Sequence, residues 1–537
     1  MLRYAARKPQ PTYLRTRAGI NRGYASTDGG VAERDVVIVG GGPAGLALAS
    51  ALANSKLVQK NIKITLVEAG DLQKVREWHM PPGTYSNRVS SITNSSRVFL
   101  EGIGAWQHVE QERTCPVQDM QVWDGVSDAR ITFSASELPM HSTPEISRLT
   151  ENLNLQRGLL RHIGQFPEVQ LLHKVKVQNI VRDDCEGNAW PLVHLSDGTV
   201  IRARLLVGAD GFNSPVRTYA GIQSYGWAYD THGIVATLFH APRLPMLGSN
   251  TVAYQRFLPT GPIAFLPLSE TASTLVWSTK PHLASALKTA DPAILTAMIN
   301  AAFRLPAISL RYLHDRQAQG SGVPRSAFSS LAAADTGIPP ADVEMVPPLV
   351  NAIQPGTVAS FPLRFSHAEA YVGEGSGART VLVGDAAHTI HPLAGQGLNL
   401  GIADAEALTK CIEDALVAGG DVGSYTSLLP YARGRYFENH KMLSACDKLH
   451  KLYSTTASPI VWARSVGLEV LNELDTIKAA LMMSAGSERA KPPGQVGWEL
   501  AAKGVEAFAR NVDNVRELGS SAKTLVDAGV RQLLQRR

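Results

Sequence analysis

The sequence predicts an α/β protein in which a Rossmann-like nucleotide-binding domain is joined to an antiparallel β-sheet domain and followed by a C-terminal helical region. Three observations lead to this prediction. A glycine-rich turn at residues 40–45 follows a short apolar strand and opens a helical pattern. Short strand-like segments separated by turn residues occupy residues 120–135 and 222–365. From Tyr425 onward the apolar residues recur at helical spacing.

The composition is that of a folded globular protein. The 537 residues are 44% hydrophobic and 18% charged, which is sufficient for a large core. A net charge of +5 is mild for this length and gives no case for nucleic acid as a partner. The four cysteines are far apart and form no CxxC pair, so we expect neither a disulfide framework nor a metal site. No apolar run reaches the roughly 18 residues that a membrane-spanning helix needs.

Residues 1–30 have the composition of a targeting segment. They are rich in arginine, contain hydroxyl residues and have no acid before Asp28. They also lack the apolar core of a secretory signal. This composition is typical of a mitochondrial transit peptide, which would place the mature N-terminus near Ala25. The alternative is a disordered basic tail.

A dinucleotide fingerprint opens the first structured unit. Gly40 allows the tight turn after the strand, Gly42 lets a pyrophosphate approach the backbone, and Gly45 lets helix and strand pack closely. A second strand ends at Glu68, where an acid can hold the ribose hydroxyls of an adenosine. The alternative for Glu68 is an exposed acid at the end of a strand.

Beyond Glu68 the regular alternation of strand and helix stops. We predict short antiparallel strands around Trp123, a helix over residues 145–163, and strands within residues 169–183 and 193–211. Asp197 and Gly198 form a typical hairpin turn between two of these strands.

Two further acids lie at strand ends. Asp210 follows an apolar strand, and Asp385 follows the apolar run at 381–383. In open α/β sheets ligands bind outside the carboxyl ends of the strands. Gly395, Gly397 and Gly401 then lead into a helix whose N-terminus offers unpaired N–H groups to a ligand. The alternative is a plain turn with small residues for packing, but the three motifs together indicate one extended dinucleotide.

These motifs resemble those of the aromatic-ring flavoprotein monooxygenases, which adopt the hydroxybenzoate-hydroxylase fold. The resemblance rests on GxGxxG at 40–45, GADGxxSxVR at 208–217 and GDAAHxxHPxxGQGLNxGxxD at 384–404, in this order. It covers about residues 35–450.

Two stretches narrow the resemblance to the ubiquinone-biosynthesis hydroxylases: HPLAGQGLNLGIAD at 391–404 and AYQRFLPTGPIAFLPL at 253–268. With the basic leader, the chain resembles the eukaryotic mitochondrial members of that family. The segment at about 304–355 is similar to an insertion typical of those members, and its composition alone predicts a long, partly mobile surface excursion.

The resemblance implies FAD as the cofactor. The residues that it assigns to FAD are Gly40, Gly42, Gly45 and Glu68 at the adenosine end, Arg88, Gln156 and Asp210 near the pyrophosphate, Asp385 on the ribityl chain, and Pro392, Gly397, Leu398 and Asn399 around the isoalloxazine. Backbone N–H groups of Leu398 and Asn399 would stabilise the reduced, anionic ring. Arg88 has the alternative of a surface arginine.

The implied reaction is hydroxylation of a polyprenylated 4-hydroxybenzoate at ring carbon 5 by dioxygen, through a flavin C4a-hydroperoxide. Because the cofactor carries such chemistry, we expect no catalytic triad. His388 and His391 are candidates for an acid or base, although a lone loop histidine is more often structural. The alternatives are hydroxylation at another ring position, another phenol as substrate, and a non-catalytic relative that binds lipid or assembles a complex.

The antiparallel sheet is expected to bind the substrate. A ring with a carboxylate and a prenyl tail suits the apolar residues and single cation at Tyr254, Arg256, Phe257, Pro262, Phe265 and Leu266. We assign the substrate carboxylate to Arg256. The alternative is an edge-strand arginine with a surface partner.

The resemblance also implies partners and a location. No second nucleotide fingerprint opens a helix, because the glycines at 373–377 read as a loop. A mitochondrial ferredoxin and its reductase, with NADPH upstream, are the implied electron source, and direct use of NAD(P)H stays open. The implied location is the matrix side of the inner membrane, as a peripheral member of a ubiquinone-biosynthesis complex.

The C-terminal region carries apolar surface at Met482 and Met483, and its last 41 residues (497–537) read as amphipathic helices with a possible docking role.

The domain boundaries follow from these assignments. The boundaries are a leader at 1–30, FAD-binding parts at 35–119, 141–221 and 366–450, substrate-domain strands at 120–140, a substrate-binding sheet at 222–365, and a helical region at 451–537.

Overall fold

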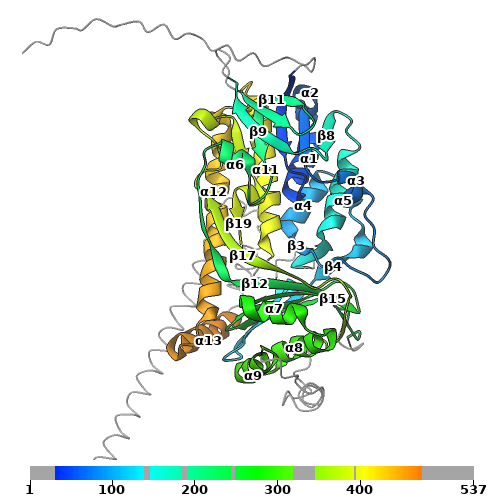
Figure 1. The fold of residues 1–537 in the computed structure, drawn as a ribbon, viewed down its shortest axis with the longest axis vertical. Coiled ribbons are helices and arrows are strands. Elements are labelled where there is room, and N and C mark those ends of the chain that lie inside the picture. The colour runs from blue at the N-terminus through cyan, green and yellow to red at the C-terminus, as the bar shows by residue number, and fades with distance from the viewer. Residues whose placement is uncertain are drawn as a thin grey trace, which may run out of the picture.

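The computed structural model describes residues 31–137, 145–183, 190–243, 248–318, 345–391 and 395–473. The predicted leader, Pro392 and the residues after 473, with Met482 and Met483, lie outside these ranges. Figure 1 shows a nucleotide-binding layer above a long curved sheet, with helices on the far side of that sheet.

The described residues form a first sheet of seven strands in the order β8-β2-β1-β11-β10-β9, with β18 paired to β11. Strands β1, β2, β8, β11 and β18 run parallel, and β9 and β10 pair antiparallel. Gly198 has φ +88 in the turn between β10 and β11, which confirms the predicted hairpin. The strands are β1 (Ala32–Val39), β2 (Ile64–Glu68), β8 (Val169–His173), β9 (Val177–Arg182), β10 (Pro191–Leu195), β11 (Val200–Gly208) and β18 (Thr380–Leu382).

Helices cover this sheet because their apolar faces join its core. Residues Val36–Val39 are buried on both faces, as expected for a central parallel strand. Leu46, Leu155 and Leu408 bring three helices into the same cluster. The elements are α1 (Pro43–Asn54), α2 (Lys56–Asn61), α3 (Leu72–Arg76), α4 (Asn94–Gly102), α5 (Asn152–Ile163), α6 (Pro215–Tyr219) and α11 (Gln396–Val417), with 3₁₀ turns η1 (Trp106–His108), η2 (Gln111–Arg113), η3 (Ala135–Glu137), η6 (Gly375–Gly377) and η7 (Gly384–Ala386).

A small sheet of three strands corrects the helix that we predicted over residues 145–163. β7 (Ser147–Glu151) lies between β3 (Val89–Thr93) and β4 (Thr114–Val117), and the helix α5 begins only at Asn152. β7 pairs with both neighbours along its length: Leu149 lies opposite Ser91 of β3 and Cys115 of β4, which come much earlier in the chain. Such long-range pairing overrides the local helical spacing.

A second sheet of nine strands, counted over the described ranges, has the order β19-β17-β12-β15-β14-β13-β5-β6, with β16 paired to β12. Its pairs are antiparallel except for β13 with β5. The strands are β5 (Asp119–Asp124), β6 (Arg130–Ser134), β12 (Ser224–His240), β13 (Val252–Leu258), β14 (Gly261–Pro267), β15 (Ala272–Thr279), β16 (Val350–Ile353), β17 (Ala359–Ala368) and β19 (His388–Thr389).

Three helices, α7 (Pro281–Thr289), α8 (Pro292–Arg304) and α9 (Ala307–Ala318), cover one face of this sheet. Both ends of the segment 304–355 therefore belong to the folded domain, which corrects the predicted surface excursion at these two ends. Leu310 and Leu313 of α9 are buried in the core, and β16 extends the sheet. Their three-residue spacing places both leucines on one face of the helix.

The chain after 424 is helical, as predicted, up to the end of the described range. α12 (Tyr425–Ser454) runs along the molecule, and α13 (Ser458–Asn472) packs against β6 at the edge of the second sheet.

Candidate cofactor site

The glycine turn between β1 and α1 combines two crowded positions with an open one. A Cβ at Gly40, where φ is +114, would lie 2.2 Å from the carbonyl oxygen of Ala209, and one at Gly45 would lie 2.0 Å from that of Gly40. A Cβ at Gly42 would meet no atom within 4 Å. Packing therefore requires Gly40 and Gly45, whereas Gly42 leaves space at the N-terminus of α1, where helix N–H groups can bind a phosphate.

Glu68 and Gln156 lie against this turn. The Glu68 carboxylate accepts hydrogen bonds from the N–H groups of Gly41 and Gly70. Gln156 of α5 donates from Nε2 to the carbonyl oxygen of Gly41 at 3.3 Å. A carboxylate has lone pairs for further donors, so Glu68 can also accept bonds from ribose hydroxyls.

Asp210 follows β11 beside the same turn. Its Oδ2 accepts a hydrogen bond from the N–H of Val216 at 3.1 Å. Burial raises the pKa of Asp210, and hydrogen bonds from Ser214 and Val216 only partly offset this effect. The three strand-end acids, Glu68, Asp210 and Asp385, lie at the ends of β2, β11 and β18, which are parallel strands of one sheet, and so share its carboxyl edge.

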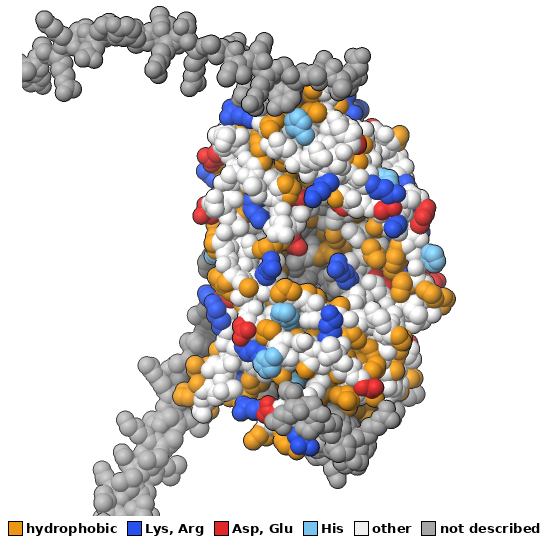
Figure 2. All heavy atoms as spheres, in the orientation of Figure 1, with side chains coloured by type: hydrophobic (Ala, Val, Ile, Leu, Met, Phe, Trp, Pro, Cys, Tyr) orange, Lys and Arg blue, Asp and Glu red, His pale blue; other side chains and the backbone are white. Residues whose placement is uncertain are grey.

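Asp385 lies in the turn η7, which packs next to α1. Its side chain is exposed, yet the surrounding protein desolvates the carboxylate and raises its pKa. A Cβ at Gly384 or Gly401 would come within 3.0 or 3.1 Å of the Cβ of Ala44, so the Asp385 turn, α11 and α1 pack closely together. Figure 2 shows a hollow in the middle of the molecular face, with Lys and Arg side chains at its rim.

The N-terminus of α11 presents backbone donors. The helix begins at Gln396 after Gly395, whose φ is +60. The N–H groups of Gly397 and Leu398 lie in the first turn of the helix, where they have no intrahelical partner. The predicted donor at Leu398 is thus available to a ligand, and the role of the Asn399 N–H stays a prediction.

The Asn399 side chain has a bridging role that the sequence did not indicate. Its Oδ1 accepts from the N–H of Thr93 at 3.0 Å, and its Nδ2 donates to the carbonyl of Ser91 at 2.7 Å. These bonds hold the N-terminus of α11 against β3.

Asp404 is a buried hub that sequence reasoning missed. Its carboxylate accepts from the N–H of Gly384 at 3.0 Å, His388 Nε2 at 2.6 Å, Arg435 Nε at 2.8 Å and Asn439 Nδ2 at 3.0 Å. Burial by itself would raise the pKa of Asp404, but the charges of His388 and Arg435 outweigh it and lower the pKa. The only signal in the sequence is its place as the last acid of the motif at 384–404.

The two candidate histidines, His388 and His391, are buried and contact other side chains of the protein. His388 is fully buried in the ion pair with Asp404. His391 is buried beside Tyr229 and His450, with ring centroids 5.1 and 4.8 Å away. Burial lowers the pKa of His391 to about 3, so at neutral pH its imidazole is uncharged and a weak base. These positions favour the structural alternative for both.

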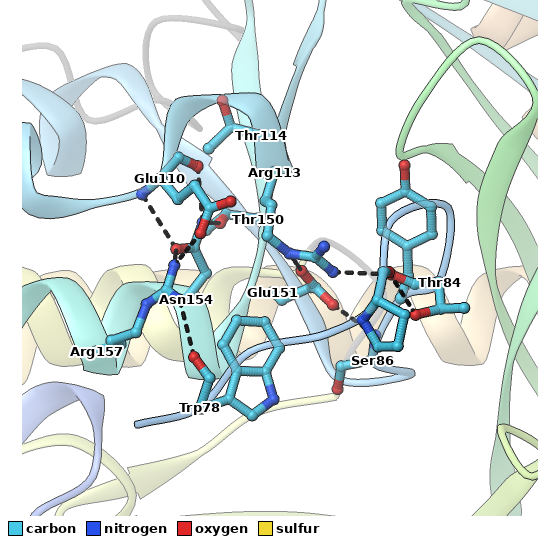
Figure 3. Close-up of polar contacts among 12 residues, drawn as sticks. Trp78, Thr84, Ser86, Glu110, Arg113, Thr114, Thr150, Glu151, Asn154 and Arg157 are labelled. Atoms are coloured by element: carbon cyan, nitrogen blue, oxygen red, sulfur yellow. Dashed lines mark hydrogen bonds and ion pairs between the residues drawn. The ribbon is translucent and has the colours of Figure 1, made fainter. Parts of the chain in front are cut away.

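Arg88 directly follows the segment of residues 78–87, whose backbone is hydrogen-bonded to the side chains of Glu151 and Arg113 (Figure 3). The carboxylate of Glu151 accepts from the N–H of Ser86 at 2.5 Å and from Arg113 Nε at 2.6 Å, and Arg113 Nη2 donates to the carbonyl of Thr84 at 2.9 Å. The Arg88 side chain itself is exposed at the start of β3.

The expected substrate residues divide between the two faces of the second sheet. Tyr254 and Phe265 pack with Phe303 of α8, on the face turned away from the nucleotide-binding domain. Phe257 lies on the other face and stacks on Tyr453 of α12 at 4.1 Å. Adjacent residues of a strand point to opposite faces, so a run of neighbours could not all line one pocket.

Arg256 also lies on the helix-covered face, which corrects both interpretations that we gave it. Its Nη1 donates to the carbonyls of Ala302 and Leu305 at 3.0 and 2.9 Å, at the end of α8. Burial lowers its pKa to about 10. The residues that face the nucleotide-binding domain are instead Ala253, Gln255, Phe257, Pro262, Ala264 and Leu266.

Comparison with known proteins identifies the cofactor and confirms the fold class. Residues 33–318 and 354–426 match a family model described as an FAD binding domain. Crystal structures of p-nitrophenol 4-monooxygenase PnpA from Pseudomonas putida (TM-score 0.60, 16% identity, 86% of this chain and 100% of that chain) and of PqsL, a probable FAD-dependent monooxygenase from Pseudomonas aeruginosa (0.56, 20%, 81% and 99%), share the fold.

Sequence relatives cover most of the chain. A Schizosaccharomyces pombe protein is 36% identical over 495 residues (91% of this chain, 99% of the relative), a Saccharomyces cerevisiae protein 38% over 466 residues (84%, 93%), and a human protein 36% over 461 residues (84%, 92%). All three are named mitochondrial ubiquinone biosynthesis monooxygenase COQ6. The chain therefore belongs to the COQ6 family of FAD-dependent ubiquinone biosynthesis monooxygenases, as its motifs predicted.

Proposed function

We propose that this FAD-dependent monooxygenase hydroxylates ring carbon 5 of a polyprenylated 4-hydroxybenzoate in ubiquinone biosynthesis. The family supports the reaction class and the pathway. A hydrophobic, prenylated phenol as substrate is supported by the face of the second sheet that is turned toward the cofactor site. There Ala264 and Leu266 are apolar and only partly buried by the protein, and a long prenyl tail can be buried against such side chains.

The protein's own contribution is binding and orientation. We propose that Gly42 and the N-terminus of α1 hold the FAD pyrophosphate, Glu68 the adenosine ribose, and Asp385 the ribityl chain, with the N–H of Leu398 at the ring. Bound FAD supplies the redox chemistry by which dioxygen hydroxylates the ring. The apolar sheet face keeps water from the reacting atoms.

We further propose a peripheral position on the matrix side of the inner mitochondrial membrane, within a multi-protein complex. Among the described helices, none has the length and apolarity to span a bilayer. The outer side of α13 carries Trp462, 70% exposed, and Val466 and Val470, which suit contact with lipid or a partner. A ferredoxin with its reductase and upstream NADPH remains the proposed electron source, as the family resemblance implies, and direct use of NAD(P)H stays open.

Disruption of the gene tests the ring position. Cells without the protein should accumulate a prenylated precursor that lacks the hydroxyl at carbon 5, and the intact gene should remove it. Mass spectrometry and NMR of the accumulated compound identify the missing group. A precursor already hydroxylated at carbon 5 would instead favour another ring position, and normal ubiquinone levels would favour another phenol or a non-catalytic relative.

The two faces of the sheet should respond differently to substitution. Ala264→Trp fills the cofactor-facing side of β14 and should raise KM for the prenylated phenol about tenfold without changing FAD content. Arg256→Ala leaves two carbonyls at the end of α8 without their charged donor and should cost about 1.5–3 kcal/mol of stability with KM unchanged.

Steady-state kinetics of both variants measure KM, and urea unfolding measures their stability. A raised KM in Arg256→Ala alone would restore the original assignment of the carboxylate.

A further inference from the structure

A cluster of buried polar groups outside the cofactor site holds the segment of residues 78–87, which directly precedes Arg88. Glu151 is fully buried at the end of β7, and Arg113 is largely buried beside it. Figure 3 shows the two carboxylate oxygens turned to different partners: one toward the N–H of Ser86, the other toward Arg113. Arg113 reaches on to the carbonyl of Thr84, so one ion pair holds the segment at two points.

Two arginines also enclose the start of this segment. The guanidinium groups of Arg113 and Arg157 each lie 5.3 Å from the ring centroid of Trp78, and Arg113 lies 5.2 Å from that of Tyr85. Arg157 donates from Nη1 to the carbonyl of Trp78 at 2.8 Å. Cation–π contacts of this kind and charged hydrogen bonds together fix the backbone from Trp78 onward.

The far side of the segment is bonded to the substrate sheet domain. The side-chain amide of Gln354 exchanges two hydrogen bonds with the backbone of Tyr85, each 2.9 Å long. Asn87 donates from Nδ2 to the carbonyl of Thr357 at 2.5 Å. The residues next to Arg88 are thus held from the nucleotide-binding side and from the sheet side at once.

Arg88 itself is bonded through its backbone to the same place. Its carbonyl accepts from the N–H of Asn152 at 2.9 Å, one residue after Glu151, and the next residue, Val89, pairs with Glu151 between β3 and β7. Glu151 also precedes α5, the helix that brings Gln156 to Gly41. A change at Glu151 therefore acts on the backbone on both sides of Arg88, whose exposed side chain makes the predicted contact with FAD.

We infer that Glu151 is a positioning residue for the cofactor, which sets the place of Arg88 through its bonds to Ser86 and Arg113. The inference rests on the FAD site and on the predicted role of Arg88, and not on the ring position. Losing the anion leaves Arg113 without its counter-charge and loosens the segment at Ser86 and Thr84, so Arg88 reaches the pyrophosphate less often. FAD binds more weakly although every residue that contacts FAD is still present.

A double-mutant cycle on FAD affinity tests this coupling. The full-length apoprotein is titrated with FAD, and quenching of flavin fluorescence gives Kd for the wild type, Arg88→Ala, Glu151→Gln and the double variant. Each single change should weaken binding about tenfold. The double variant should bind no more weakly than Arg88→Ala, because Glu151 acts through Arg88. Two independent, multiplying losses, or no loss in either single variant, would overturn the inference.

A matched control separates positioning from plain stability. Glu145→Gln breaks another buried ion pair, with Arg97 and Arg148, and should lower stability to urea with FAD affinity unchanged. If Glu151→Gln does not fold, Arg113→Lys takes its place in the cycle, because lysine keeps the charge and loses the fork that spans Glu151 and Thr84. FAD affinity is measured without any phenol, so this result and the ring position of hydroxylation are independent.

Discussion

Replacing Asp404 with alanine is expected to cost about 3–5 kcal/mol of folding free energy, because it leaves the largely buried guanidinium of Arg435 without its counter-charge. The same change releases the N–H of Gly384 and the ring of His388, which fix the turn that carries Asp385. The purified variant should therefore be both less stable to urea and deficient in FAD. Urea unfolding and the flavin absorbance per chain measure the two losses.

An exposed acid on the same helix provides the control. Asp414→Ala on α11 should change stability by no more than about 0.5 kcal/mol, as is usual for surface positions. If Asp404→Ala unfolds at the same urea concentration as Asp414→Ala, the buried hub does not stabilise the turn.

The stability that Asp404 provides should also depend on pH. The pKa of Asp404 is lower in the folded protein than in the unfolded chain, where it is about 4. Its stabilising contribution is therefore complete above pH about 4 and is lost as the pH falls toward the folded pKa. In a series of urea unfolding curves, the difference between the wild type and Asp404→Ala should shrink in acid and stay constant near neutral pH.

Gly42→Val is expected to fold normally and to lose FAD. Gly42 has φ −71 and ψ 176, which valine adopts readily, and its Cβ would meet no protein atom within 4 Å. The added side chain would instead occupy the space where the pyrophosphate meets the N-terminus of α1. FAD affinity should fall at least about 100-fold while the melting temperature of the apoprotein changes little.

Gly40→Ala should behave in the opposite way. Its Cβ would lie 2.2 Å from the carbonyl of Ala209, and its φ of +114 is strained for any side chain, so the protein should fail to fold. Circular dichroism and FAD titration of both variants separate the two roles. Normal FAD affinity in Gly42→Val would show that the pyrophosphate does not lie at this turn.

The positions that could be predicted correctly are those whose signal lies in residues adjacent in the sequence. The turn at Gly40, Gly42 and Gly45, and the acids Glu68, Asp210 and Asp385, each follow a short apolar strand, so their place at the strand ends could be read locally. Their place at one edge of the sheet could be predicted because parallel strands end at the same edge.

Non-local pairing explains what the sequence could not provide. Residues Ser147–Glu151 have a helical spacing, but their partners in β3 and β4 are far away in the chain, and pairing with them makes a strand. Glu151 and Asp404 have no local signature, because their partners Arg113 and Arg435 come from other elements. Such hubs appear only once the fold has brought the charges together.

The substrate residues show a different limit. Tyr254 and Arg256 lie within three residues of Phe257, and the motif that contains them gave no indication of which face each one takes. A strand alternates faces strictly, so the register must be known before a pocket can be assigned. Arg256, the one cation of the stretch, turned out to bind the end of α8.

Oxygen transfer to a defined ring carbon can be observed with labelled dioxygen. The full-length protein, loaded with FAD and reduced by a ferredoxin system, is given a polyprenylated 4-hydroxybenzoate under ¹⁸O₂, and the product is analysed by mass spectrometry and NMR. We expect one ¹⁸O atom in a new hydroxyl at ring carbon 5, and no product with Gly42→Val. A product labelled at another carbon, an unlabelled hydroxyl, or turnover by the FAD-free variant would contradict the proposed function.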